Sequence, residues 1–437
     1  MSLRDIDVQK IPTASRFYGR FLTPTYSVFF VGVACLLAST VNAQSVSQQT
    51  ILSLDQAVHR TLEQHPQLGV FLHRREAYQG LVEQVGVGER PNVSVMVEDF
   101  GGNGDHNGLG GAQSTLSISW ITQNARIDQR IQSARVAASQ VDIEQEVTAL
   151  DLSAQTARLF VQALVEEQRL TLAKKAIQQA RDAVATIQKR VEVGKSPEFE
   201  RLQAEVELAQ RELEAEDLQH VLSSTRYQLA AQWGGERDGF RLEGELFKAP
   251  AVGSVDQQLA RLKQNPALTL LATQKRIAES EIELARIEAK PQWQFSVGVR
   301  RFEATDDFGM IAGVSVPLGK DRSSAGKIRS LLAKQGEYDS ESAALKRQLG
   351  TQLYVLLQEI NHSQHVIQTL QEQIIPILSS AQAQAGQAYE TGQLGYQQWT
   401  AILNKKLGAQ QDLLSAFEAI HLQHIELQRL TGTTLTF

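Results

Sequence analysis

The sequence predicts an α+β membrane protein that is internally duplicated, with long α-helical coiled-coil hairpins and four β-strands per chain. Three observations predict this fold class. No Gly or Pro occurs between Ala112 and Val193, two pairs of short segments alternate apolar and polar side chains, and the same landmarks recur about 200 residues apart. Together they favour a repeated unit of two strands and a helical hairpin over a continuous fibrous coiled coil.

Residues 1–43 have the three parts of a secretory signal peptide. Basic residues from Arg4 to Arg20 precede an apolar segment at about residues 26–38, and the small side chains of Val41 and Ala43 place the cleavage site before Gln44. The apolar segment is too short to span a bilayer as a stable helix. We therefore expect an exported chain that begins at Gln44.

The composition excludes some classes of function. The chain is 42% hydrophobic and 21% charged, with a formal net charge of -6, which suits a folded protein and excludes a basic nucleic-acid binder. The single cysteine, Cys35, lies inside the apolar segment of the signal rather than at its end. We therefore expect no lipid anchor, disulfide or thiol in the exported chain.

Residues 44–235 form the first predicted repeat. A helical segment from Leu54 is interrupted near Pro66, and two alternating segments follow on either side of a loop rich in Gly and Asn. Their apolar positions are Val93, Val95 and Val97, then Leu116, Ile118 and Trp120. The predicted elements are strands at about 92–100 and 113–121, a long helix at about 124–192, a tip at 193–197 and a return helix at 198–233.

The long helix of the first repeat is predicted from its apolar periodicity. Apolar residues recur at steps of three and four from Ile127 to Val191, which is the seam of a helix packed along its whole length. At 1.5 Å rise per residue such a helix is about 100 Å long. Gly194 ends it, and Pro197 suits the start of the return helix.

An irregular linker at 236–254 leads to the second predicted repeat, residues 255–432, and a short tail, 433–437. Pro66 and Pro91 of the first repeat correspond to Pro266 and Pro291 of the second. Pro376 is expected to kink the second long helix. The predicted elements are strands at about 292–302 and 308–318, a long helix at about 325–390, a tip at 391–395 and a return helix at 397–430.

The strands have the length and period of membrane-crossing β-strands, with one apolar face. Unpaired strand edges do not occur in lipid, so such a sheet must close, and four strands are too few to form a spanning barrel. The barrel must then be shared between copies of the chain, and two, three or four copies would satisfy this requirement. The alternative is a small soluble sheet that caps a coiled coil.

The sequence resembles the outer-membrane efflux factors, the TolC-like family, over essentially all of the exported chain. The closer similarity is to the CzcC-type outer-membrane component of cobalt-zinc-cadmium resistance systems. The motifs that carry it are RPNVSVMVED at 90–99, VGKSP at 193–197, QNPAL at 264–268, GVRRFE at 298–303 and GVSVPL at 313–318. Each motif is short, and their order and spacing make the resemblance specific.

The resemblance implies a homotrimer in the outer membrane of a Gram-negative bacterium. A 12-strand β-barrel in outer-membrane lipid would continue as a 12-helix periplasmic α-barrel. The partners would be a periplasmic membrane-fusion adaptor and an inner-membrane RND proton-driven pump. The chain would be the passive exit duct of this tripartite complex, and the substrates would be divalent heavy-metal cations.

The two helical tips are the candidate binding sites. Gly194 and Gly392 end helices, and the resemblance implies that the tips dock against hairpins of the adaptor. The residues concerned are Gly194, Lys195 and Ser196 in the first tip, and Gly392, Gln393 and Leu394 in the second.

The channel mouth would lie just beyond the tips. Some relatives carry acidic residues after the second tip, but Gln398 stands at the matching position here. Glu200, at the equivalent place after the first tip, is acidic. We therefore assign cation selection to the pump rather than to a carboxylate ring in this chain.

Two histidine pairs are candidate metal contacts. His362 and His365 are three residues apart on one predicted helix, as are His421 and His424 on another, so each pair shares a helix face. Imidazole suits zinc or cobalt, but two ligands make at most half a site. The alternative is that these histidines are solvated or packed.

We find no catalytic constellation and expect no cofactor. The Gly-rich stretch at 101–104 precedes a strand rather than a helix, so it is not a phosphate-binding loop. Within the transport reading, multidrug export and type I protein secretion compete with metal efflux. A periplasmic coiled-coil adaptor or a scaffold protein is the alternative from a different class.

Overall fold

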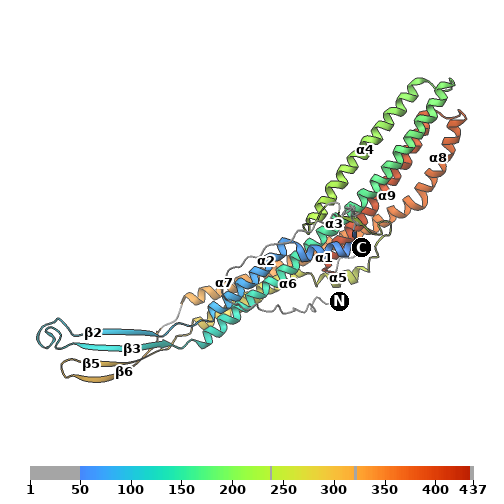
Figure 1. Ribbon diagram of the computed structural model, residues 1–437. Coiled ribbons are helices and arrows are strands. Elements are labelled where there is room, and N and C mark those ends of the chain that lie inside the picture. The colour runs from blue at the N-terminus through green and yellow to red at the C-terminus, as the bar shows by residue number, and fades with distance from the viewer. Residues whose placement is uncertain (1–49, 237–238, 319–321, 434–437) are drawn as a thin grey trace, which may run out of the picture. The chain divides into compact units, whose positions relative to one another are not determined.

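The computed structural model describes residues 50–236, 239–318 and 322–433. The predicted signal peptide and cleavage site lie outside the described residues, as does the tail from 434 onward. Each predicted repeat contributes two short helices, a strand pair, a long helical segment and a return helix. Figure 1 shows the four long strands at one end of the described bundle and the helical tips at the other.

The first repeat follows the sequence-based bounds closely. Its long helix, α3, spans Asn124–Glu192, and the strands β2 and β3 span Asn92–Glu98 and Gln113–Ile121. Strand β2 is therefore two residues shorter than predicted. The remaining elements are β1 (Thr50–Leu52), α1 (Leu54–Gln64), α2 (Pro66–Val85), a 3-10 turn η1 (Gly104–His106) and α4 (Glu198–Ala231).

The second repeat differs from the first in its long helix. Helix α7 (Arg322–Thr369) gives way to a π-helical segment, η2 (Leu370–Ile374), before α8 (Ile375–Glu390). The break falls beside Pro376, which has no N–H to donate, and a wider turn accommodates the missing bond. The other elements are α5 (Val255–Leu262), α6 (Pro266–Glu288), β5 (Gln294–Phe302), β6 (Asp307–Ser315) and α9 (Tyr396–Thr431).

Helix caps show the duplication at the level of single residues. Ser53 and Ser254 each form a capping box with a glutamine three residues later. His65 caps α2 through Nδ1, and Asn265 caps α6 through Oδ1, each just before a proline at the first helical position. Asn265 is buried and also donates from Nδ2 to the carbonyl of Leu430, at 2.9 Å. The second copy of this cap is therefore tied to the end of α9.

The hydrophobic core surrounds the middle of α3. Its members include Phe160 of α3 and Phe417 of α9, which are almost completely buried. Strand β1 pairs in parallel with β4 (Phe240–Leu242), so the predicted irregular linker contains a short strand. Phe240 packs edge-on against Trp233, with ring centroids 5.8 Å apart. Each of these two strands is only three residues long, too short for an alternating pattern that would predict the sheet.

Shorter helices of both repeats lie along opposite halves of α3 (Figure 1). Helices α2 and α6 pack on its N-terminal half, where Arg75 of α2 contacts Asp142 at 2.8 Å. Helices α4 and α9 pack on its C-terminal half, where Glu212 of α4 contacts Arg181 at 2.7 Å. Two shorter helices placed end to end therefore span the length of α3.

Strands β2, β3, β5 and β6 form one antiparallel sheet in that order. Strand β3 pairs with β2 through Val95↔Leu116 and with β5 through Leu116↔Val299. Strand β5 pairs with β6 through Val299↔Met310. Because side chains alternate across a strand, these four apolar residues share one face of the sheet.

Candidate functional site

The apolar face of the four-stranded sheet is largely exposed. Met310 is 90% exposed, Val95 72% and Val299 47%. Arg301, at the loop end, is the only charged strand residue on this face. The apolar face consists of Val93, Val95, Val97, Leu116, Ile118, Trp120, Phe295, Val297, Val299, Phe308, Met310, Ala312 and Val314. An exposed apolar surface of this kind marks a contact with lipid or with another protein.

Aromatic rings lie at both ends of the apolar face. Near the helices, Phe295 stacks between Trp120 and Trp293, with ring centroids 6.1 and 6.4 Å away. Near the loops, the guanidinium carbon of Arg301 lies 6.0 Å from the ring centroid of Phe308. An apolar band with aromatic rings at both borders is the pattern of a strand sheet that crosses a bilayer.

The opposite, polar face of the sheet carries mainly small or hydrogen-bonding side chains. Ser94 and Ser117 join β2 to β3, with their Oγ atoms 2.8 Å apart. Gly298 has no room for a side chain, because an added Cβ would lie 2.6 Å from the carbonyl oxygen of Leu116. The charged strand residues on this face are Glu98, Arg300 and Asp307.

The two outer strands of the sheet each have one unpaired edge in the described part of the chain. Strands β2 and β6 have one strand neighbour each, whereas β3 and β5 have two. The four strands alternate in direction, so β6 is antiparallel to β2. The free edges could therefore pair antiparallel with the edges of another copy.

No described helix is both long enough and apolar enough to serve as a transmembrane helix.

The helical tips at the other end of the bundle are shaped by two glycines. Gly194 and Gly392 have φ of +71° and +80°, a conformation that glycine adopts without strain. The amides of Lys195 and Gln393 then bond back to the ends of α3 and α8, at 2.7 and 2.8 Å. These four residues are exposed, and Leu394 is half-buried.

Ser196 differs from the other predicted tip residues because it is buried. Its Oγ accepts a hydrogen bond from Nε of Arg190, at 3.1 Å. The Arg190 Nη1 atom donates to the carbonyls of Tyr389 and Glu390, at 2.8 and 3.2 Å. Arg190, from the first tip, therefore holds the backbone of the second tip in place.

The guanidinium of Arg190 also covers an aromatic cluster. Its central carbon lies 4.7 Å from the ring centroid of Tyr389, and Trp399 stacks parallel to the same ring at 4.6 Å. We define the tip cluster as Ile187, Ala204, Tyr389, Tyr396 and Trp399. Burial raises the pKa of Tyr389, and burial together with nearby Glu207 raises the pKa of Tyr396 to about 12. Both phenols are therefore neutral near pH 7.

Gln398 and Glu200, the predicted mouth residues, have different surroundings. The Gln398 side chain is exposed, and its Oε1 accepts a hydrogen bond from the amide of Gly395 at 3.1 Å, which caps α9. Glu200 is half-buried in the first turn of α4. Gln398 thus has a structural role that its position after the second tip did not indicate.

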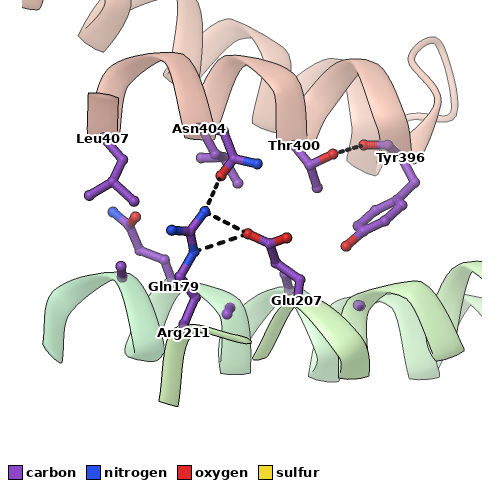
Figure 2. Close-up of a pocket in the computed structure, with 12 residues that line it drawn as sticks. Gln179, Glu207, Arg211, Tyr396, Thr400, Asn404 and Leu407 are labelled. Atoms are coloured by element: carbon purple, nitrogen blue, oxygen red, sulfur yellow. Dashed lines mark hydrogen bonds and ion pairs between the residues drawn. The ribbon is translucent and has the colours of Figure 1, made fainter. Parts of the chain in front are cut away.

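Arg211 forms a second link between the hairpins, beside a small cavity (Figure 2). Figure 2 shows its guanidinium directed at Glu207 on the same helix and at Asn404 of α9, at 2.7 and 3.1 Å. Glu214 accepts a third hydrogen bond from Arg211, at 2.9 Å. The cavity volume is ≈ 30 Å³. This space suits one or two waters rather than an organic ligand.

The four candidate histidines do not converge. His362 and His365 are exposed and line an open groove with Val366 and Leu370. His421 is buried, and its Nε2 lies 2.9 Å from the carbonyl oxygen of Leu246, so that nitrogen carries the proton. Burial lowers the pKa of both His421 and His424. Among the described residues, no group of three or more His, Cys, Asp or Glu side chains is placed to share a metal ion.

Comparison with known proteins finds one matching family model and several similar solved structures. Residues 57–235 match the family described as "Outer membrane efflux protein". A crystal structure of CusC is 15% identical with a TM-score of 0.69, covering 87% of this chain and 92% of CusC. VceC from Vibrio cholerae is 16% identical with a TM-score of 0.68, covering 87% of this chain and 96% of VceC.

A structure of the outer-membrane channel OprN is 16% identical with a TM-score of 0.67, covering 87% of this chain and 90% of OprN. No curated protein sequence matches the chain. At these identities, the comparisons establish that the chain has the fold of these channels, with a helical part and a strand part.

The Arg190 contacts predict that the two tips are mechanically coupled. Replacing Arg190 with alanine removes the contacts to Tyr389, Glu390 and Ser196, so we expect the amides of residues 387–396 to exchange with solvent at least about tenfold faster. Hydrogen–deuterium exchange measured by mass spectrometry checks this. Lys189→Ala, an exposed neighbour, is the control and should change little. Equal exchange in both variants would contradict the coupling.

Proposed function

We propose that this chain is one subunit of an outer-membrane efflux channel, the exit duct of a tripartite complex. The observation that carries the proposal is the exposed apolar face of the sheet, bordered by aromatic rings, which has the chemistry of a surface in lipid. The fold shared with CusC, VceC and OprN supports the same function. The chain would reside in the outer membrane of a Gram-negative bacterium, with its helices in the periplasm.

Because β2 and β6 each have a free edge, the sheet of the proposed assembly must close on itself. An unpaired edge in lipid leaves N–H and C=O groups unsatisfied, at a cost of several kcal/mol each. Since β6 is antiparallel to β2, a sister copy can extend the ladder on each side without a change of pattern. Three copies would give a 12-strand barrel, within the known range for spanning barrels.

The helices fit the same three-copy assembly. Each chain supplies two long rods, α3 and the α7–α8 segment, and two composite rods in which shorter helices follow one another. Three chains would give a wall of twelve rods of matched length. Such a channel would conduct its substrate passively, because the proton-driven RND pump at the inner membrane supplies the energy for transport.

The exposed tips are the proposed docking site for the periplasmic membrane-fusion adaptor. Gly194, Lys195, Gly392 and Gln393 are exposed, and Leu394 is partly accessible. The Ser196 hydroxyl accepts a hydrogen bond from Arg190 and supports the tip from inside. We therefore assign docking to the exposed residues and bracing to Ser196.

Divalent heavy-metal cations are the proposed substrates, supported by the sequence motifs shared with cobalt-zinc-cadmium systems. The chain itself supplies no carboxylate at Gln398 and no converging histidines among its described residues. The ion would then be selected by the pump, and the duct would conduct what it receives. A duct without a selective site is equally suited to multidrug export or type I protein secretion, which is the second candidate.

The lipid-facing assignment predicts opposite outcomes for neighbouring residues of β3. Lysine at Ile118, on the apolar face, should cost about 2–4 kcal/mol at mid-membrane and reduce the assembled protein in outer-membrane fractions. Lysine at Ser119, on the polar face, should be tolerated because it would point into water. Quantitative immunoblotting of the fractions, with and without heating, checks this. Equal yields for the two variants would remove the lipid assignment.

The docking assignment predicts that a charge at the first tip stops efflux. Gly194→Asp would place an uncompensated carboxylate in a packed interface, which costs about 3–5 kcal/mol, so zinc and cobalt resistance should be lost while assembly persists. Gly194→Asn is the matched control, because asparagine tolerates positive φ and adds no charge. Growth of a complemented deletion strain is the measurement. Wild-type resistance with Gly194→Asp would contradict docking at this tip.

A further inference from the structure

Arg300 on the polar face of the sheet joins three of the four strands. Its Nη2 lies 2.8 Å from Oε2 of Glu98 on β2. Its Nη1 and Nε donate to Gln113 Oε1 and Thr115 Oγ1 on β3, each at 2.9 Å. All three nitrogens of the guanidinium are therefore engaged by side chains that come from elsewhere in the sheet.

This network lies at the end of the sheet farthest from the helices. Glu98 is the last residue of β2 and Gln113 the first of β3, so both adjoin the loop at 99–112. Gln113 Nε2 also donates to Asp99 Oδ2 at 2.8 Å, which extends the network to the loop. In the proposed channel, this end of the sheet is the external exit.

The rest of the polar face toward the helices is lined mostly by small side chains. The levels of paired residues between Arg300 and the helices carry Asn92, Ser94, Ser117, Ser119, Ser296, Gly298, Gly313 and Ser315, with Ile121, Gln294 and Ile311 as the larger exceptions. Arg300 is thus the longest side chain on this face and, with Glu98, forms its only described ion pair. Asp307, at the level of Glu98, is the one further charged strand residue on this face. Charged side chains that line a passage influence which ions pass.

We propose that Arg300 and Glu98 form the ion-selectivity ring at the exit of the pore, one pair from each subunit. The ligands are hydrated inorganic ions of either sign. Because each Arg300 is paired with a Glu98, the pair adds no net charge to the exit, and removing one partner shifts the preference of the pore between cations and anions. This proposal rests on the proposed channel function.

A purely structural role for Arg300 would be to hold three strands together. Both roles predict some loss of stability on substitution, so stability does not distinguish them. Ion selectivity does, because a network outside the permeation path would leave the reversal potential unchanged. Arg301 supplies a matched control: it lies one residue away, on the opposite face, where it contacts Glu303 and Asp306.

The test is single-channel recording of the assembled protein in planar lipid bilayers under a potassium chloride gradient. Arg300→Gln should raise the ratio of potassium to chloride permeability and Glu98→Gln should lower it, each by about threefold, the effect of a unit charge about 7 Å from an ion in water. Arg300→Lys should restore the wild-type ratio. The double variant keeps the net charge of the exit, so it should match the wild type, as should Arg301→Gln.

The outcomes separate this inference from the function on which it rests. Unchanged reversal potentials in a conducting protein would overturn the ring and leave the channel intact. If the wild type forms no pore, the proposed function fails and the ring fails with it. Should Arg300→Gln fail to assemble, Glu98→Gln decides alone: a shift toward anions supports the ring, and the wild-type ratio overturns it.

Discussion

The unsatisfied edges of a four-stranded sheet are the constraint on which the rest of this structure depends. The sheet exposes a broad apolar face, so it requires an apolar environment, and β2 and β6 leave backbone groups that lipid cannot satisfy. Lipid would cover the apolar face, and pairing between copies would satisfy the edges, because the alternating strand directions allow the ladder to continue from β6 to β2 of a neighbour. In the proposed assembly, the chain is one segment of a closed wall.

The helices would continue the proposed wall away from the membrane. A wall of uniform height needs rods of equal length, and duplication supplies them: α3 and the α7–α8 segment run the full length, while the shorter helices divide it between them. The tips are braced from within by Arg190, which leaves Lys195 and Gln393 accessible. A rigid tip with an exposed rim is suited to docking, since little conformational entropy is lost on binding.

Periodicity and composition predicted much of the fold, but not the contacts that shape its candidate sites. The absence of Gly and Pro predicted α3 to its terminal residues, and alternation predicted the strands to within a few residues. The Arg190–Tyr389 and Arg300–Glu98 contacts join residues about 200 positions apart, so no local pattern reports them. The sequence places Gln398 after the second tip, but it does not reveal the hydrogen bond that Gln398 accepts from the amide of Gly395, because that bond depends on the turn there.

Disulfide trapping between sister copies would show whether β6 of one copy pairs with β2 of the next. Cysteines would replace Val95 on β2 and, in turn, Met310, Ala312 or Val314 on β6, since bridging requires Cβ atoms about 4 Å apart. If three copies close the sheet, one combination gives covalent dimers and trimers, and nothing larger, in native outer membranes under oxidation. A chain that stays monomeric and water-soluble with every combination would contradict closure of the sheet between copies.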